Sequence, residues 1–324
     1  MSLVPTIDVH LDATRWQASR AERARETLTA RPRSLDALWF YDEHGSDLFD
    51  AITRSPEYYQ TRAERALLLA RAGDIAACGA DTLVELGSGT SDKTTALLDA
   101  MDAAGNLSRY IPFDVSEETL RAAVSSLGER YPDVEFHGVV GDFHHHLGTI
   151  PEAKRRLVAF LGGTIGNLRP GVRRGFLADL DAVLTPDDAL LVGIDLVKDP
   201  AVIVAAYDDA AGITAAFNRN ALAVLNRELD GDFDPEAFDH VARWNADQRW
   251  IEMRLRARSP QQVRIAGLDL DLAIDEGEDI LTEISAKFTV EGFAAELDAC
   301  GFDLDGTWIS PGDEFALVCA RSRT

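Results

Sequence analysis

The feature that most constrains this sequence is a glycine-rich turn that follows a short apolar strand. Residues 82–86 are Thr-Leu-Val-Glu-Leu, and Gly87, Ser88 and Gly89 come directly after them. Glycines in such a turn let backbone N–H groups approach a ligand where side chains would collide. The third small position of the turn is not glycine, which disfavours the tightly packed pyrophosphate site of a dinucleotide-binding fold. The turn alone therefore indicates a nucleotide-like ligand of undefined type.

The segments around this turn predict an α/β fold. Residues 110–115, 136–140, 157–161 and 189–196 are apolar and strand-like, and helical patterns separate them. Short strands that alternate with helices predict a mostly parallel sheet with helices on both faces. Near the C-terminus, residues 306–309 and 315–320 predict two strands that end the sheet in antiparallel fashion.

This alternation stops between residues 197 and 285. Residues 201–229 are alanine-rich and helical in pattern, whereas residues 250–255 and 263–270 alternate between polar and apolar. Such alternation predicts antiparallel strands with one solvent-exposed face. We infer an insertion after the fifth strand that joins the N-terminal segment in a second, α+β domain. The expected division is 62–196 with 287–324 for the ligand-binding sheet, and 1–61 with 197–286 for a substrate-binding or lid domain.

Acidic residues at the ends of successive strands define the ligand further. Asp114 ends the second strand, at the offset where a carboxylate binds ribose hydroxyls, and Asp142 ends the third. Asp142 can accept from an adenine amino group, while the backbone N–H of Phe143 can donate to a ring nitrogen. Lys93, one turn into the following helix, can meet a carboxylate. Together with the loose turn, these residues predict an S-adenosylmethionine site at the carboxyl edge of the sheet.

Composition limits the partners. The net charge of −23, without a basic stripe, argues against nucleic acid and favours a small-molecule or peptide substrate. The three cysteines indicate reduced thiols, and no signal or membrane pattern is recognisable, so we expect a cytoplasmic protein. We expect a monomer. We expect no metal at His144, His145 and His146, because adjacent side chains diverge and no Cys or acidic partner has ligand spacing.

Several longer runs resemble one family, the L-histidine Nα-methyltransferases of ergothioneine biosynthesis. Most of these runs lie outside the cofactor region, so the resemblance is specific. The runs are WFYD at 39–42, GSDLF at 45–49, PEYY at 56–59, ELGSGTS at 85–91, PFDV at 112–115, GGTIGN at 162–167, YDD at 207–209, FNRN at 217–220 and TEISAKF at 282–288.

The resemblance implies a Rossmann-like class I methyltransferase sheet and three methyl transfers from S-adenosylmethionine to the α-amino group of free histidine, which yield hercynine. It also implies two sets of site residues. The cofactor set is Tyr41, Gly87, Ser88, Lys93, Asp114, Asp142 and Phe143. The substrate set is Tyr58, Asn167, Tyr207, Glu283, Ile284 and Ser285, with Gly162, Thr164, Phe49 and Met253 lining the pocket.

The implied substrate residues suit the chemistry of histidine. Asn167 and Tyr207 are neutral donors for its carboxylate. Glu283 and Ser285 are two apart in an extended segment, so both side chains point the same way and can address the two imidazole nitrogens. No residue is identifiable as a general base. Two alternatives remain, a methyltransferase for another amino acid or amine and a non-catalytic module that binds S-adenosylmethionine.

Overall fold

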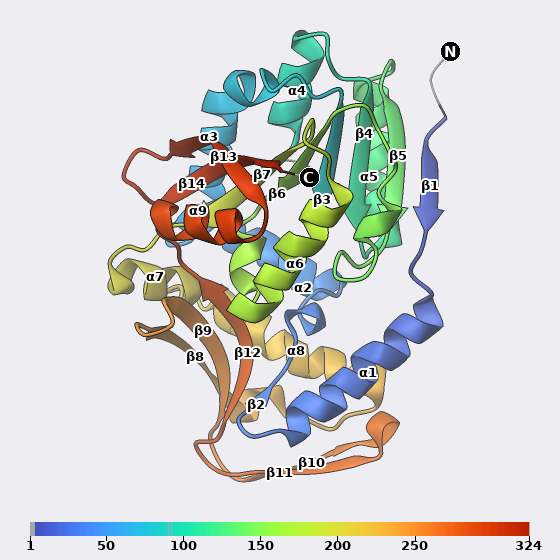
Figure 1. The fold of residues 1–324 in the computed structure, drawn as a ribbon. Coiled ribbons are helices and arrows are strands. Elements are labelled where there is room, and N and C mark those ends of the chain that lie inside the picture. The colour runs from blue at the N-terminus through green and yellow to red at the C-terminus, as the bar shows by residue number, and fades with distance from the viewer. Residues whose placement is uncertain (1–3, 90, 92, 324) are drawn as a thin grey trace. The chain divides into compact units, whose positions relative to one another are not determined.

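The computed structural model describes residues 4–89, 91 and 93–323 and divides into two compact units (Figure 1). The first unit contains residues 62–196 together with the described residues up to 12 and from 288 onward. The second unit contains residues 13–61 and 197–287. This division differs from the expected one mainly at the N-terminus, where residues up to 12 belong to the first unit rather than the second.

The first unit is built on one eight-stranded sheet in the order β1-β5-β4-β3-β6-β7-β14-β13. Neighbouring strands are parallel from β1 to β7, and β14 and β13 are antiparallel. This arrangement confirms the predicted fold class. The strands are β1 (Thr6–Val9), β3 (Thr82–Leu86), β4 (Arg109–Asp114), β5 (Glu135–Val140), β6 (Arg156–Phe160), β7 (Ala189–Asp195), β13 (Phe302–Ile309) and β14 (Phe315–Ser322).

Helices cover both faces of this sheet. They are α3 (Tyr59–Ala76), α4 (Thr95–Ala103), α5 (Glu117–Arg130), α6 (Pro170–Val183) and α9 (Val290–Ala299). Buried side chains of α3, α4 and α5 share one core with Leu157 and Ala159 of β6. The next residue of β6, Phe160, packs instead on Phe176 of α6, with ring centroids 5.0 Å apart. Because successive strand residues point to opposite faces, α6 covers the other side of the sheet.

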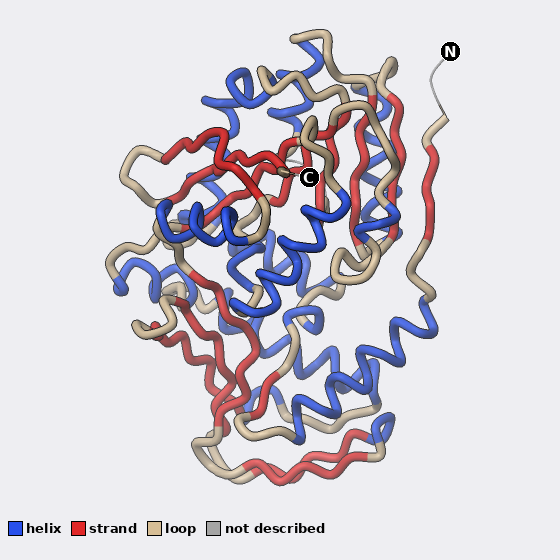
Figure 2. Tube along the Cα trace, viewed as in Figure 1, coloured by secondary structure: helices blue, strands red, loops and turns tan. Residues whose placement is uncertain are grey.

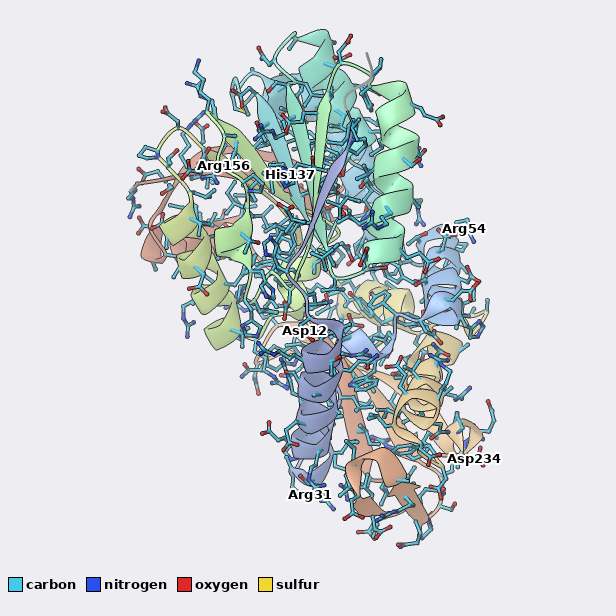
Figure 3. The ribbon with its side chains drawn as sticks, turned by 90° about the vertical axis from the view of Figure 1, so that its right-hand side faces the viewer. Asp12, Arg31, Arg54, His137, Arg156 and Asp234 are labelled. Carbon is cyan, nitrogen blue, oxygen red and sulfur yellow. The ribbon has the colours of Figure 1, made fainter. Side chains whose placement is uncertain are left out.

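Two side-chain contacts link strands of this sheet, and Figure 3 labels a residue of each. Arg156 at the start of β6 is paired with Asp188 just before β7, with Nη2 and Oδ2 2.6 Å apart and both side chains buried. His137 of β5 lies 2.7 Å from a carboxylate oxygen of Asp8 on β1. The second contact helps hold β1 at the sheet edge, and this four-residue strand was not predicted from the sequence.

The second unit combines helices with two small sheets (Figure 2). Its four-stranded sheet has the order β2-β12-β9-β8, and β10 and β11 form a separate hairpin. The helices are α1 (Ala13–Thr29), α2 (Glu43–Arg54), α7 (Pro200–Tyr207) and α8 (Ile213–Leu229). The strands are β2 (Arg33–Ser34), β8 (Phe238–Asn245), β9 (Trp250–Ala257), β10 (Gln261–Ile265), β11 (Leu270–Ile274) and β12 (Asp279–Ala286).

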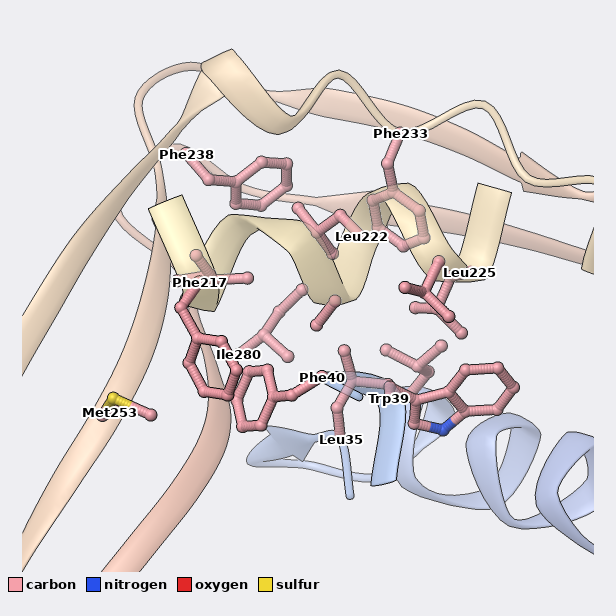
Figure 4. Packing of buried hydrophobic residues seen from close by; sticks show 14 of the residues in the cluster. Leu35, Trp39, Phe40, Phe217, Leu222, Leu225, Phe233, Phe238, Met253 and Ile280 are labelled. Atoms are coloured by element: carbon pink, nitrogen blue, oxygen red, sulfur yellow. The ribbon is translucent and has the colours of Figure 1, made fainter. Parts of the chain in front are cut away.

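The core of the second unit joins its N-terminal segment to its helices and strands (Figure 4). Trp39 and Phe40 are only 2% and 1% exposed. The Phe40 ring stacks on Phe217 of α8, with centroids 4.6 Å apart. Met253 of β9 and Ile280 of β12 belong to the same cluster. The aromatic segment therefore anchors residues 13–61 to the helices and strands of residues 197–287.

Three local expectations were wrong. Residues 201–229 form two helices, because Asp209 accepts from the backbone N–H groups of Ile213 and Thr214 and starts α8 anew. The adjacent acidic residues Asp208 and Asp209 are typical of a solvated surface, but Asp209 is buried. Residues 263–270 are not one strand, since a turn at Ala266–Leu268 separates β10 from β11.

Candidate functional site

The glycine-rich turn after β3 is braced by the end of β4. Gly87 and Gly89 have φ angles of 67° and 49°, which non-glycine residues rarely adopt. The backbone N–H of Gly89 donates to Oδ2 of Asp114 over 2.8 Å, and that of Ser116 donates to Oδ1 over 2.9 Å. Carboxylate oxygens accept more than one hydrogen bond each, so Asp114 can hold the turn and still receive ribose hydroxyls. Thr90, part of the predicted turn, lies outside the described residues.

The Ser88 side chain offers a direct test of whether this turn fits a polar ligand. Ser88 is 6% exposed, and within the described part of the chain its Oγ has no hydrogen-bond partner. A buried hydroxyl left in this condition costs about 1–3 kcal/mol. A ligand with polar groups at the turn would remove that cost. The turn therefore fits the nucleoside or amino-acid portion of S-adenosylmethionine.

A buried network lies around Glu85, the β3 residue two before the turn. Its carboxylate accepts from the hydroxyls of Thr94, just before α4, and Tyr110, on β4. Tyr110 Oη is also 2.8 Å from Ser91 Oγ. Burial raises the pKa of Glu85 to about 7, although the two hydroxyl donors oppose the shift. Glu85 thus connects β3, β4 and the segment that leads into α4.

Asp142 and Phe143 follow β5 with different surroundings. Asp142 is 7% exposed, and its Oδ1 accepts from the backbone N–H of His144 over 2.9 Å. The Phe143 ring packs on Phe160 and Phe176, with centroids 5.4 and 5.5 Å away. The Phe143 ring is therefore part of the aromatic packing against α6, and a role for its backbone N–H in adenine binding stays a prediction.

Lys93 has a partner that the sequence did not suggest. Its Nζ donates to Oε2 of Glu64 on α3 over 2.8 Å, and the Glu64 side chain is 1% exposed. The other oxygen, Oε1, accepts from the backbone N–H of Gly162 over 2.7 Å. Glu64 thus links a predicted cofactor residue to a predicted substrate residue. The sequence does contain a signal that Glu64 is buried. It precedes the buried Leu67 and Leu68 by three and four residues, which places it on the same face of the helix.

Three predicted substrate residues follow β6 in the first unit. Gly162 and Gly163 have φ angles of 80° and 67°, and a short helical turn spans Thr164–Asn167. The hydroxyl of Thr164 donates to the carbonyl of Leu161 over 3.0 Å. Asn167 is half-buried at the end of this turn.

The remaining predicted substrate residues lie in the second unit. Glu283 and Ser285 alternate on one face of β12 and pair with Met253 and Ile251 of β9. The intervening Ile284 is buried and has the opposite phase. Ser285 is 5% exposed. The expected common direction of Glu283 and Ser285 therefore agrees with the strand geometry.

A buried lysine continues the same alternation. Lys287 is 3% exposed, and its Nζ donates to Oγ of Ser285 over 2.9 Å and to Oη of Tyr207 over 3.0 Å. Its Nζ also lies 4.8 Å from the centre of the Tyr207 ring. Sequence reasoning missed Lys287, although the period of two from Glu283 through Ser285 places it on the same face.

An aromatic chain lies in the same unit. Phe49 is in edge contact with Tyr58 at 6.3 Å, and Tyr58 with Tyr207 at 6.2 Å between centroids. Tyr41 is in edge contact with Phe49 at 5.7 Å. Desolvation, and then the carboxylate of Glu283 and the phenol of Tyr207, raise the pKa of Tyr41. Tyr41, predicted as a cofactor contact, thus lies near substrate residues within the second unit.

The amino-acid sequence matches one known family over most of its length. Residues 20–322 match the family described as histidine-specific, S-adenosylmethionine-dependent methyltransferase. The chain belongs to this family. The resemblance noted in the sequence is thereby confirmed, and the family match extends over both units.

Individual members of the family are similar over nearly the whole chain. The histidine N-alpha-methyltransferases of Mycolicibacterium smegmatis and Mycobacterium tuberculosis are 57% and 53% identical, over 91% and 90% of this chain and 92% of each relative. Ergothioneine biosynthesis protein 1 of Neurospora crassa is 36% identical over 90% of this chain, but that match covers 34% of the relative.

Two structural features are absent from the described residues. No group of three or more His, Cys, Asp or Glu side chains is arranged to hold a metal ion, the histidines at 144–146 included. Among the same residues, no helix has both the length and the apolar character needed to cross a membrane.

Proposed function

We propose that this methyltransferase transfers three methyl groups from S-adenosylmethionine to the α-amino group of free L-histidine, producing hercynine for ergothioneine biosynthesis. The observation that carries the proposal is the pair of Glu283 and Ser285 on one face of β12, in a chain of a histidine-specific family. A carboxylate and a hydroxyl at this spacing suit the two nitrogens of an imidazole.

We assign cofactor binding to the first unit. Asp114 would accept from the ribose hydroxyls and Asp142 from the adenine amino group, while Lys93 would meet the methionine carboxylate. Two observations support this assignment: the Ser88 hydroxyl has no hydrogen-bond partner among the described residues, and β4 and β5 end at the acidic residues Asp114 and Asp142. When bound, S-adenosylmethionine supplies an electrophilic methyl group on a sulfonium.

We assign most of the acceptor contacts to the second unit. Glu283 would accept the N–H of one imidazole nitrogen, and Ser285 would donate to the other. Tyr207 would donate to the histidine carboxylate. Buried polar groups that need such partners discriminate against analogues lacking them by several kcal/mol.

The contribution of the protein to the reaction is then mainly positioning. Holding the amine in line with a methyl group can supply roughly 7–11 kcal/mol in favourable cases. The aromatic chain of Phe49, Tyr58 and Tyr207 would desolvate the amine, which lowers its pKa and exposes its lone pair. The same rings would lie against the growing methylammonium, with about 0.5–2 kcal/mol of cation–π stabilisation for each contact. We assign no general base.

Incubation with S-adenosylmethionine and a panel of free amino acids, analysed by mass, tests the proposal. We expect products with one, two and three added methyl groups from histidine and none from the other amino acids. Transfer to a different amino acid would support the alternative acceptor. Calorimetric binding of S-adenosylmethionine without transfer to any amine would instead support the non-catalytic module.

A further inference from the structure

Lys287, Ser285 and Tyr207 form a buried cluster whose hydrogen bonds have a defined direction. All three residues are less than a tenth exposed, and the Lys287 ammonium lies within 3.0 Å of both hydroxyl oxygens. An ammonium group carries only donors and no acceptor. Both oxygens must therefore accept from Lys287, and neither hydroxyl can give its proton to that nitrogen.

The direction of these bonds determines what the two hydroxyls can offer a ligand. A serine or tyrosine hydroxyl has one proton to donate. With an oxygen lone pair of each hydroxyl occupied by Lys287, the protons of Ser285 and Tyr207 point away from the ammonium. Both hydroxyls are then preset as donors, which suits a carboxylate and an unprotonated ring nitrogen.

We propose that Lys287 is a positioning residue that presets Ser285 and Tyr207 as donors, so that the site selects histidine with a neutral imidazole in the tautomer that donates to Glu283. The inference rests on the proposed function and extends it to the protonation state of the substrate. A protonated imidazole carries N–H groups on both nitrogens and has no lone pair for the Ser285 proton. The positive charge of Lys287 beside Ser285 disfavours that form further.

The strand neighbours of Glu283 and Ser285 on this face of the sheet are apolar, which favours the role of Lys287. On the face of β12 that carries Glu283 and Ser285, the paired residues Met253 and Ile251 of β9 are apolar. Beyond them, β8 contributes Ala242 and Trp244.

Other titratable groups lie nearby. Tyr41 is close enough to Glu283 for the carboxylate to raise its pKa. His240 lies with Nε2 2.8 Å from the Tyr207 carbonyl oxygen, and burial lowers the pKa of its imidazole. Glu252 and Arg254 of β9, with Arg243 of β8, lie on the opposite face of the sheet.

Lys287→Met tests the role, because methionine keeps a long unbranched side chain and removes the donors. In the wild type we expect the KM for histidine to rise about tenfold for each pH unit below the ordinary imidazole pKa of about 6.5. In Lys287→Met we expect KM at about pH 8 to increase about tenfold or more, with a smaller change in kcat. The variant should also lose most of the rise in KM at low pH, because Ser285 can then turn and accept from an imidazolium N–H.

Lys198→Met is the matched control. Lys198 donates to Oη of Tyr59 over 2.6 Å and lies 4.2 Å from the Tyr59 ring centre, a similar contact in the same unit. This variant should keep the wild-type pH profile of KM. Ser285→Ala, which leaves Lys287 in place, should flatten the profile as Lys287→Met does, and it serves as the second variant where Lys287→Met does not fold.

Parallel KM profiles for the wild type, Lys287→Met and Ser285→Ala would overturn the inference, since a merely structural lysine would lower activity equally at every pH. A wild type that methylates no histidine would instead overturn the proposed function itself. Calorimetric binding of S-adenosylmethionine by each variant shows that the first unit is intact in these comparisons.

Discussion

At the scale of single residues, several polar and charged side chains in or beside the assigned sites are buried and paired. Glu64, Glu85, Ser285 and Lys287 are each less than a tenth exposed, and each is hydrogen-bonded to another described residue. Burying a charge or a polar group is unfavourable unless it is paired, so such groups persist where their partners are also fixed. Their hydrogen-bond partners therefore hold these buried side chains in fixed positions.

Glu283→Gln should weaken histidine binding with little effect on the cofactor. Glutamine keeps an oxygen that can accept from the ring N–H, but it removes the charge that strengthens this bond. We expect a loss of about 1–2 kcal/mol, which is about five- to thirtyfold in KM for histidine. Initial rates at saturating S-adenosylmethionine and varied histidine measure this change in KM. Glu276→Gln, an exposed residue in the same unit, is the control. An unchanged KM would contradict the assigned contact.

Glu85 should make the stability of the first unit depend on pH. Its pKa is raised from 4.5 to about 7 in the folded state, so the folded chain binds more protons than the unfolded chain between these values. The stabilisation is fully present below about pH 4.5 and is lost as the pH rises through about 7, by up to about 3 kcal/mol.

Urea unfolding of the wild type and Glu85→Gln over a pH series from about 5 to about 8 tests this dependence. Glutamine does not titrate, so the free energy of unfolding of the wild type should fall relative to that of the variant as the pH rises. A constant difference between the two proteins would show that Glu85 is ionised throughout this range.

The sequence identified side chains that stand at a recognisable place in the expected fold, such as the end of a strand. It did not identify those whose hydrogen-bond partners come from distant segments. Asp114 and Asp142 were identifiable because each ends a strand of the expected sheet. Glu64 was not identified from the sequence, because its contact with Gly162 spans 98 residues. Lys287 was likewise overlooked, because its contact with Tyr207 depends on where α7 ends.

At the scale of elements, the sheet was predictable and the insertion only in part. Apolar strands with both faces covered are unambiguous, as residues 82–86 illustrate. The alternation of residues 263–270 continues through a turn with Asp269 at a φ of 47°, and periodicity alone does not distinguish such a hairpin from one strand. The break between α7 and α8 depends on Gly212 and on the capping side chain of Asp209.

Glu64→Gln tests the link between α3, Lys93 and the segment after β6. Glutamine can still accept hydrogen bonds, but the Lys93 ammonium loses its buried counter-charge. We expect the orientation of Lys93 to loosen and the Kd for S-adenosylmethionine to increase about tenfold, measured by calorimetry. Glu129→Gln, exposed on α5, should leave the Kd unchanged. A normal Kd for Glu64→Gln would show that the ion pair does not hold Lys93 for the cofactor.

At the scale of the whole molecule, the division into two units predicts where each ligand protects the backbone from hydrogen exchange. A ligand present at about 100 times its Kd stabilises the folded state that binds it by about 2.7 kcal/mol. With the product S-adenosylhomocysteine, we expect slower exchange near Gly87, Asp114 and Asp142 in the first unit. Addition of histidine should then slow exchange in β12 and at the end of α7, in the second unit. Protection of β12 by S-adenosylhomocysteine alone, with no further change on adding histidine, would contradict the assignment of cofactor and acceptor to separate units.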